Sequence, residues 1–189
     1  DKVLHATLSP DNKQLAYVKS NNLYIMSLEN GSVDAVTTDG EWNKIINGNC
    51  DWVYEEEFGF SQAFSWSPDG KYIAYYRFDE SGVPLFIMPK YFDLYPDNYT
   101  YKYPKAGEPN SVIEIKLYDT KTKTTVNADL GTETDQYIPR IKWTNDPSQL
   151  CIYRMNRLQN KLELLFADAL TGATQVVYKE ENKSYVEVN

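Results

Sequence analysis

A short pattern of strand, turn and strand occurs three times along the chain, and it limits the fold more than any other feature of the sequence. The copies are residues 6–18, 64–76 and 141–153, the last of them degenerate. The second copy contains Ser-Pro-Asp-Gly, which suits a tight turn because proline presets φ, aspartate caps its own backbone and glycine accepts a positive φ. The β-branched and aromatic residues on either side favour pleated strands. The pattern therefore predicts a series of β-hairpins.

Each hairpin continues in the same way, through a third apolar strand, a polar turn and a weaker fourth strand. Four antiparallel strands in roughly 40 residues are typical of a β-propeller blade. A β-sandwich with coincidental turns is the alternative, but Ser-Pro-Asp followed by Leu-Ala-Tyr or Ile-Ala-Tyr in two copies favours the propeller. The sequence therefore predicts an all-β fold of about three four-stranded blades, at residues 6–38, 63–127 and 140–178.

Three blades are too few for a closed ring. Closed propellers have about 4–8 blades. An arc of three would leave its end blades with an open face, which stacked repeats normally avoid. We therefore expect residues 1–189 to form a segment of one larger propeller domain.

The composition narrows the classes of function. The chain of 189 residues has 27 acidic and 19 basic residues and a formal net charge of -8. Nucleic-acid binding is therefore not expected, because such a site needs a basic footprint. The single histidine, His5, excludes a multi-histidine metal site, and we expect no metal and no cofactor. No run approaches the ~18 apolar residues of a membrane span, so none is expected in this segment.

The two cysteines leave the redox state open. Cys50 and Cys151 lie far apart in the sequence, and neither has a partner at a metal-binding spacing. A disulfide between them and a pair of free, buried thiols are both compatible with the sequence.

An insertion at residues 40–62 separates the first two blades and predicts a short helix. Asp51 is a good N-cap, the glutamates that follow suit the first turn of a helix, and Gly59 can end it. Three consecutive carboxylates, Glu55 to Glu57, lie among aromatic residues. Two carboxylates about 4 Å apart repel by about 4 kcal/mol at an effective dielectric of 20, and a primary ammonium between them relieves the repulsion. An exposed and solvated acidic helix face is the alternative.

A second insertion, the arm, spans residues 79–110 within the second blade. A loop of this length inside a compact domain is normally functional. Its many apolar and aromatic residues would cost ~25 cal/mol per Å² if they stayed in water. Contact with a partner would bury them, and packing against the blade itself is the alternative.

Two octapeptides resemble signatures of one enzyme family. Asp51-Trp52-Val53-Tyr54-Glu55-Glu56-Glu57-Phe58 is similar to the glutamate-motif helix of dipeptidyl peptidase IV enzymes, in the prolyl oligopeptidase family of serine peptidases, and Tyr103-Pro104-Lys105-Ala106-Gly107-Glu108-Pro109-Asn110 resembles a second signature of that group. The resemblance implies an N-terminal propeller fragment of an enzyme that releases X-Pro and X-Ala dipeptides. It places the binding of the free N-terminal amine of peptide substrates on Glu56 and Glu57. The supporting residues it implies are Glu55, Trp52 and Tyr54.

The resemblance also implies what the chain lacks. The catalytic triad of the family lies in an α/β-hydrolase domain, and no part of this sequence resembles one, so no catalytic residue is expected here and the chain alone should be inactive. Residues 59–63 differ from a nucleophile elbow, which needs a strand before it and a helix after it. Arg140 is expected to have a structural role.

The partners and the compartment follow from the same resemblance. We expect the missing blades and the hydrolase domain as partners, and a homodimer through residues 79–104 of the arm. Bacterial members are exported, so a periplasmic or cell-surface location is expected. One alternative function is a non-catalytic propeller that binds protein partners through its aromatic arm, and a weaker one is a carbohydrate-binding propeller, which leaves the three glutamates unexplained.

Overall fold

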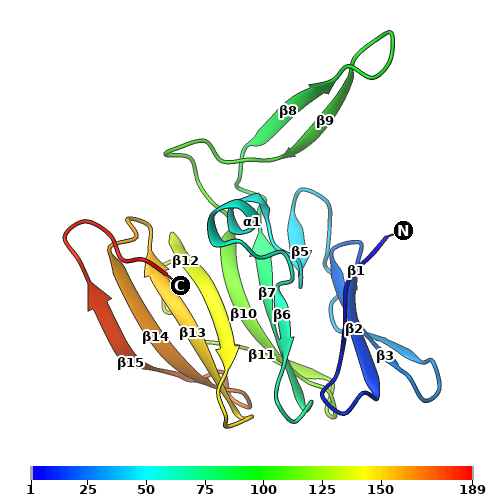
Figure 1. The fold of residues 1–189 in the computed structure, drawn as a ribbon, viewed down its shortest axis with the longest axis vertical. Coiled ribbons are helices and arrows are strands. Elements are labelled where there is room, and N and C mark those ends of the chain that lie inside the picture. The colour runs from blue at the N-terminus through cyan, green and yellow to red at the C-terminus, as the bar shows by residue number, and fades with distance from the viewer. Residues whose placement is uncertain (1, 189) are drawn as a thin grey trace.

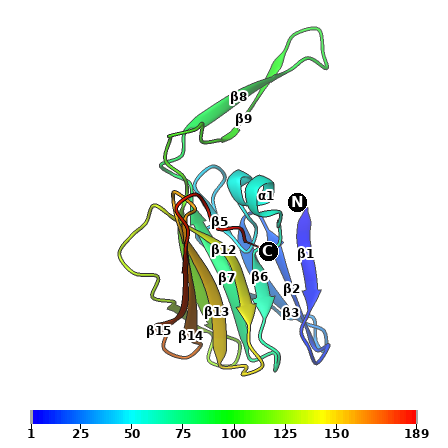
Figure 2. The same ribbon diagram turned by 60° about the vertical axis from the view of Figure 1, so that its left-hand side comes forward.

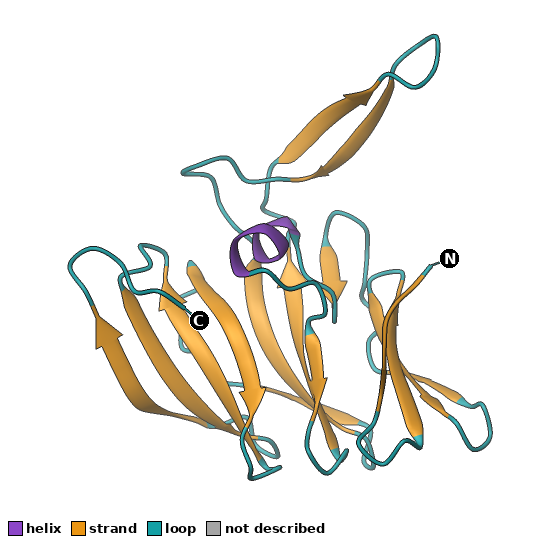
Figure 3. Cartoon of the chain, viewed as in Figure 1, coloured by secondary structure: helices purple, strands orange, loops and turns teal. Residues whose placement is uncertain are grey.

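The computed structural model describes residues 2–188, which form three antiparallel blades side by side, one short helix and a projecting hairpin (Figures 1 and 3). Blade one is a four-stranded sheet in which neighbours along the chain pair with each other. The strands of blade one are β1 (Val3–Leu8), β2 (Gln14–Lys19), β3 (Asn22–Ser27) and β4 (Val33–Ala35). The expected all-β, partial propeller is confirmed.

Blade two is built around β7 (Tyr72–Asp79), which pairs with β10 (Val112–Asp119) on one edge. Its other edge is shared by two short strands, β5 (Ile45–Asn47) and β6 (Phe64–Trp66). Beyond β10 the sheet ends at β11 (Thr124–Asn127). The sequence suggested that the helical insertion lies between blades one and two. In the structure it instead interrupts the first strand of blade two, because β5 before it and β6 after it both pair with β7.

Blade three repeats the simple four-stranded order of blade one. Its strands are β12 (Gln136–Trp143), β13 (Gln149–Asn156), β14 (Lys161–Asp168) and β15 (Thr174–Glu181). The arm contributes a separate two-stranded sheet that stands apart from the blades (Figures 1 and 2). The strands of the arm are β8 (Leu85–Lys90) and β9 (Asp97–Lys102).

The Ser-Pro-Asp turns of blades one and two have the same hydrogen bonds. Ser9 Oγ donates to Asp11 Oδ1, and Ser67 Oγ donates to Asp69 Oδ1, both at 2.6 Å. Each aspartate also accepts from the backbone N–H two residues later, at 3.1 Å. The position after the aspartate has a positive φ, 70° at Gly70, which explains the glycine there. The repeated sequence therefore encodes a repeated turn.

A tryptophan on the first strand of each later blade contacts the blade before it. Trp66 Nε1 on β6 donates to Thr7 O on β1, at 3.2 Å. Trp143 Nε1 on β12 donates to Ser65 O on β6, at 3.1 Å. The donors and the acceptors occupy equivalent positions in the repeat, so the two pairs of neighbouring blades are related in the same way, as in a propeller.

The first strands of all three blades are irregular at nearly the same level. β1 has one extra residue between the pairs Leu4↔Val18 and Thr7↔Ala16. β12 has an extra residue at a similar level, opposite β13. In blade two the helical insertion occupies this level, between the pairs Asn47↔Arg77 and Phe64↔Tyr75. The helix thus replaces a β-bulge of the other blades, which explains how the blade accommodates it without losing its sheet.

The core consists of two clusters, one on each side of blade two. The smaller one joins blades one and two, and the larger one joins blades two and three and includes side chains from the helical insertion. The fully buried side chains of the larger cluster include Tyr54, Phe78, Ile138 and Leu165. The helix is therefore part of the packing between blades two and three.

The cysteines are free, which excludes a disulfide between them. Cys50 is buried and Cys151 is only partly buried. Burial raises the pKa of the Cys50 thiol to about 12. The single histidine, His5, donates from Nε2 to Asn49 Oδ1 at 2.7 Å. Among the described residues, no helix has the length and apolar character needed to cross a bilayer.

Candidate functional site

The helix α1 (Trp52–Phe58) begins and ends where the sequence predicted. Asp51 is the N-cap, and its Oδ1 accepts from the backbone N–H of Tyr54 at 3.0 Å. Gly59 ends the helix in the left-handed region, with φ 68° and ψ 33°. Both limits were predictable because capping depends on the residue at the terminus and on its immediate neighbours.

The N-cap also joins the helix to the end of the arm. Asp51 Oδ2 accepts from Ser111 Oγ at 2.6 Å, directly after the second octapeptide. Burial raises the pKa of Asp51, and the hydrogen bonds from Ser111 and the helix oppose that shift. Nearby, the ring of Trp52 packs edge-on against Tyr103, with centroids 4.3 Å apart. These contacts explain why the two octapeptides occur together, since the second one holds the start of the helix that the first one forms.

Tyr54 fixes the helix to blade three. Its side chain is 2% exposed and lies among aromatic rings from blades two and three, including Phe78 and Tyr137. Its hydroxyl accepts from the backbone N–H of Ile138 on β12, at 2.8 Å. Phe58, one helical turn later, is buried on the same side and contacts Tyr137. The sequence suggested Tyr54 as a supporting residue, and its position is within the core.

Glu55, Glu56 and Glu57 all project into solvent from this anchored helix. Among residues 2–188, neither Glu56 nor Glu57 has a hydrogen-bond or ion-pair partner for its carboxylate. Glu55 lies in the first turn, where a negative charge is favourable to the helix dipole. Two adjacent carboxylates without a cation are thus presented on a helix whose other side is buried.

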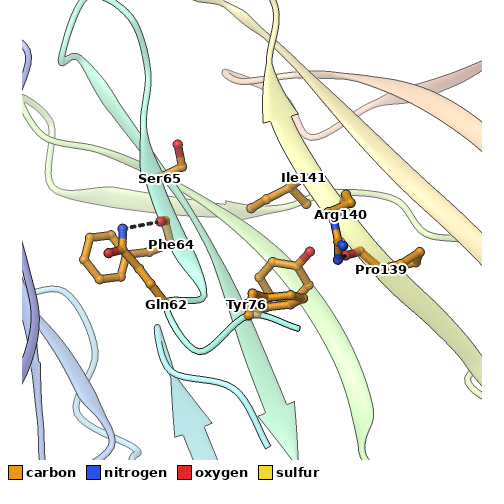
Figure 4. A pocket seen from close by; sticks show the side chains of 8 residues that line it. Gln62, Phe64, Ser65, Tyr76, Pro139, Arg140 and Ile141 are labelled. Atoms are coloured by element: carbon orange, nitrogen blue, oxygen red, sulfur yellow. Dashed lines mark hydrogen bonds between the residues drawn. The ribbon is translucent and has the colours of Figure 1, made fainter. Parts of the chain in front are cut away.

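A cavity of about 160 Å³ lies next to the helix, between the first strands of blades two and three. Figure 4 shows Gln62, Phe64 and Ser65 on one side of it, facing Arg140 and Ile141 on the other. Arg140 Nη1 donates to Phe58 O at 2.8 Å and to Pro139 O at 2.7 Å. The expected structural role of Arg140 is therefore specific, because it binds the last carbonyl of α1.

The arm is anchored at its base and exposed at its tip. At the base Phe86 contacts Tyr103, and midway along β9 Tyr99 contacts Trp42 of the helical insertion, with centroids 5.3 and 6.3 Å apart. Toward the tip, four large apolar side chains are exposed by 76 to 92%. These residues are Tyr91, Phe92, Leu94 and Tyr95. Packing against the blade therefore accounts for the base of the arm and not for its tip.

Residues 59–63 do not form a nucleophile elbow, since they follow a helix and precede a strand.

The structure shows two features that the sequence did not predict, the contact of Ser111 with the N-cap and a bulge in β12 at Ile138. Pro139 was a signal for the bulge, because proline inside a strand is confined to edges and bulges. Nothing in the sequence near Ser111 indicated its partner 60 residues away.

Comparison with known proteins gives a consistent result. Residues 1–189 match the family described as "Dipeptidyl peptidase IV (DPP IV) N-terminal region". Dipeptidyl aminopeptidase B of Saccharomyces cerevisiae is 35% identical over 191 residues, which are 96% of this chain and 23% of the relative. The crystal structure of Porphyromonas gingivalis dipeptidyl peptidase 4 superposes with a TM-score of 0.94 at 42% identity, over 98% of this chain and 26% of that one.

The chain thus spans about a quarter of the length of these relatives or less. The repeated blades, the helix that replaces a bulge and the arm all lie within the matched region. This chain belongs to the dipeptidyl peptidase IV N-terminal region family.

Proposed function

We propose that the chain is the propeller segment of a dipeptidyl peptidase IV-like serine exopeptidase, in which Glu56 and Glu57 bind the N-terminal ammonium of a peptide. The observation that carries the proposal is the pair of exposed carboxylates, without a partner among the described residues, on a helix that is fixed at both ends. Membership of the family supports a peptidase. The serine mechanism and the preference for X-Pro and X-Ala dipeptides are part of the proposal.

The chemistry of the pair suits an ammonium group. A primary ammonium has three N–H donors and one positive charge, so it can donate to both carboxylates and reduce their repulsion. Successive helical residues point about 100° apart, which lets two side chains flank one cation. An amine held at a fixed distance from the nucleophile would allow only a defined number of residues to reach it, which accounts for dipeptide release.

The test uses the full-length protein that contains this chain together with the peptidase domain that the proposal requires. Glu56→Gln and Glu57→Gln should each lower kcat/KM for Gly-Pro-p-nitroanilide about 10- to 100-fold, because a hydrogen bond to a charged group contributes about 1.5–3 kcal/mol. Glu29→Gln is the matched control, since Glu29 is an exposed carboxylate in the turn between β3 and β4. Unchanged kcat/KM in both site variants would exclude the amine-binding role.

The chain alone should not hydrolyse the substrate, because the proposal assigns the catalytic triad to another domain. Sustained turnover by purified residues 1–189 that Glu57→Gln reduces would contradict this.

By the family resemblance we also propose a periplasmic or cell-surface location. Fractionation of the producing cells that finds the protein only in the cytoplasm would overturn it.

The exposed tip of the arm favours a second role, contact with another copy of the protein. Its apolar side chains are costly in water, and a second copy would bury them. Replacing Phe92 and Leu94 by serine should convert a dimer into a monomer in sedimentation experiments, with the fold unchanged. A protein that is monomeric before the substitutions would instead favour the alternative, a propeller that binds a different partner through the arm.

A further inference from the structure

The C-terminal end of α1 is stabilised by another blade. The last turn of the helix contains no basic residue, although a cation there would complement the helix dipole. Arg140, on β12 of blade three, supplies that charge by donating from Nη1 to Phe58 O at 2.8 Å. Its guanidinium also lies over the ring of Phe60, 5.9 Å from the centroid. The residue that follows Glu57 is thus bound directly to the neighbouring blade.

The bulge in β12 makes the strand able to bind the helix. Tyr137 pairs with Met155 and Arg140 pairs with Tyr153, so β12 has one residue more than β13 between these pairs. The backbone of Ile138 is used elsewhere: its N–H donates to Tyr54 Oη at 2.8 Å, and its carbonyl accepts from Tyr76 Oη at 3.0 Å. The bulge therefore turns backbone groups away from the sheet and toward the tyrosines beside the helix.

Two contacts from one stretch of β12 consequently bracket the glutamates. Before the glutamates, the hydroxyl of Tyr54 accepts a hydrogen bond from the N–H of Ile138. After them, the carbonyl of Phe58 accepts one from the guanidinium of Arg140. The first contact lies in the core, whereas the second is partly exposed beside the cavity. Loss of the second contact would leave the Phe58 side chain packed in the core but release its carbonyl, and so loosen the main chain of the last turn, which carries Glu56 and Glu57.

We propose that Arg140 is a positioning residue for amine recognition: it fixes the last turn of α1 to blade three and thereby sets the positions of Glu56 and Glu57. This rests on the proposed function of the two glutamates. Arginine suits the task because its planar group can donate to two carbonyls at once, here Phe58 O and Pro139 O. Arg140 need not contact the substrate.

The experiment measures the full-length protein with Gly-Pro-p-nitroanilide. Arg140→Met should raise KM about tenfold with kcat within about twofold, because weakened binding that is equal in ground and transition states appears in KM. Arg140→Lys keeps the positive charge and N–H donors but not the planar group, and it should restore part of the loss. Arg157→Met is the matched control, since Arg157 also donates to a carbonyl, Glu108 O, and lies 5.9 Å from a ring centroid.

A second experiment distinguishes a positioning role of Arg140 from a general contribution to stability. In the Glu56→Gln/Glu57→Gln background, Arg140→Met should have no further effect on KM, because both residues that it positions have already lost their charge. Full additivity in this triple variant, or a fall in kcat with KM unchanged in Arg140→Met alone, would overturn the proposal. So would an unchanged KM in Arg140→Met while Glu57→Gln raises it. If neither substitution changes KM, the proposed function itself fails. Thermal unfolding of Arg140→Met, Arg140→Lys and Arg157→Met identifies losses that come only from misfolding.

Discussion

The two insertions of blade two leave the sheet at the same end of the molecule (Figure 1). They differ in whether their apolar side chains are buried. The helical insertion buries Tyr54 and Phe58 in the core and exposes its carboxylates. The arm exposes Phe92 and Leu94 by 88 and 92%. The difference teaches that the apolar side of the helix is buried within this chain, whereas the apolar side chains of the arm tip are not buried by it.

The largest expected effect contrasts an aromatic residue from each insertion. Tyr54→Ala should lower the free energy of unfolding by about 3–5 kcal/mol, because it leaves a cavity at the interface of blades two and three. Phe92→Ser should change it by less than about 0.5 kcal/mol, since the side chain already lies in water. Urea unfolding followed by circular dichroism measures both. A loss above 2 kcal/mol for Phe92→Ser would mean that the arm tip packs on this chain.

A smaller effect comes from Glu80, which lies at the start of the arm, is 6% exposed and donates from its backbone N–H to Lys44 O in the helical insertion. Burial, together with the nearby carboxylates of Asp51 and Asp79, raises its pKa to about 7, although the positive charge of Lys102 opposes the shift. The folded state therefore keeps a proton that the unfolded state loses near pH 4.5, so stability falls as pH rises from about 4.5 to 7. Glu80→Gln removes this dependence and should stabilise the protein at pH 8 by up to about 3 kcal/mol.

The measurement is the unfolding midpoint of wild type and variant between pH 4 and pH 8. The difference between them should be smallest at pH 4, where both side chains are neutral. Glu29→Gln, at an exposed position in the turn between β3 and β4, controls for the general loss of negative charge. Parallel curves for wild type and Glu80→Gln would show that Glu80 does not link the insertions electrostatically.

The smallest effect tests the base of the arm alone. Lys102 Nζ donates to Val83 O at 2.6 Å and to Ser81 O at 3.2 Å, which joins β9 to the segment before β8. Lys102→Met should cost about 1 kcal/mol locally and increase hydrogen exchange in the arm, with α1 unaffected. Lys105→Met, which removes an exposed lysine three residues later, should leave exchange unchanged. Faster exchange in α1 would show that the insertions do not behave separately.

Sequence reasoning succeeded where the cause is local. The turns at Asp11 and Asp69, and the helix limits at Asp51 and Gly59, depend on a few neighbouring residues, so they could be predicted. The blade repeat was equally visible, because each copy has the same hydrophobic pattern.

The parts of the fold and of the site that the sequence did not predict depend on contacts between segments that are distant in the sequence. Ser111 reaches Asp51 across 60 positions and Arg140 reaches Phe58 across 82, and nothing in a single sequence specifies such pairs. The direction of the arm was open for the same reason. The level at which the helix interrupts blade two was also missed, since the three residues of β5 are too few to be recognised as part of that sheet.

The tryptophans that join successive blades have a practical consequence. Trp66 reports on the contact of blades one and two, and Trp143 on the contact of blades two and three. Trp52 lies where the helix meets the arm, and Trp42 is 61% exposed beside β9. Because each of the four indoles occupies a different junction, single-tryptophan variants would give fluorescence signals that follow the separation of each pair of elements independently during unfolding.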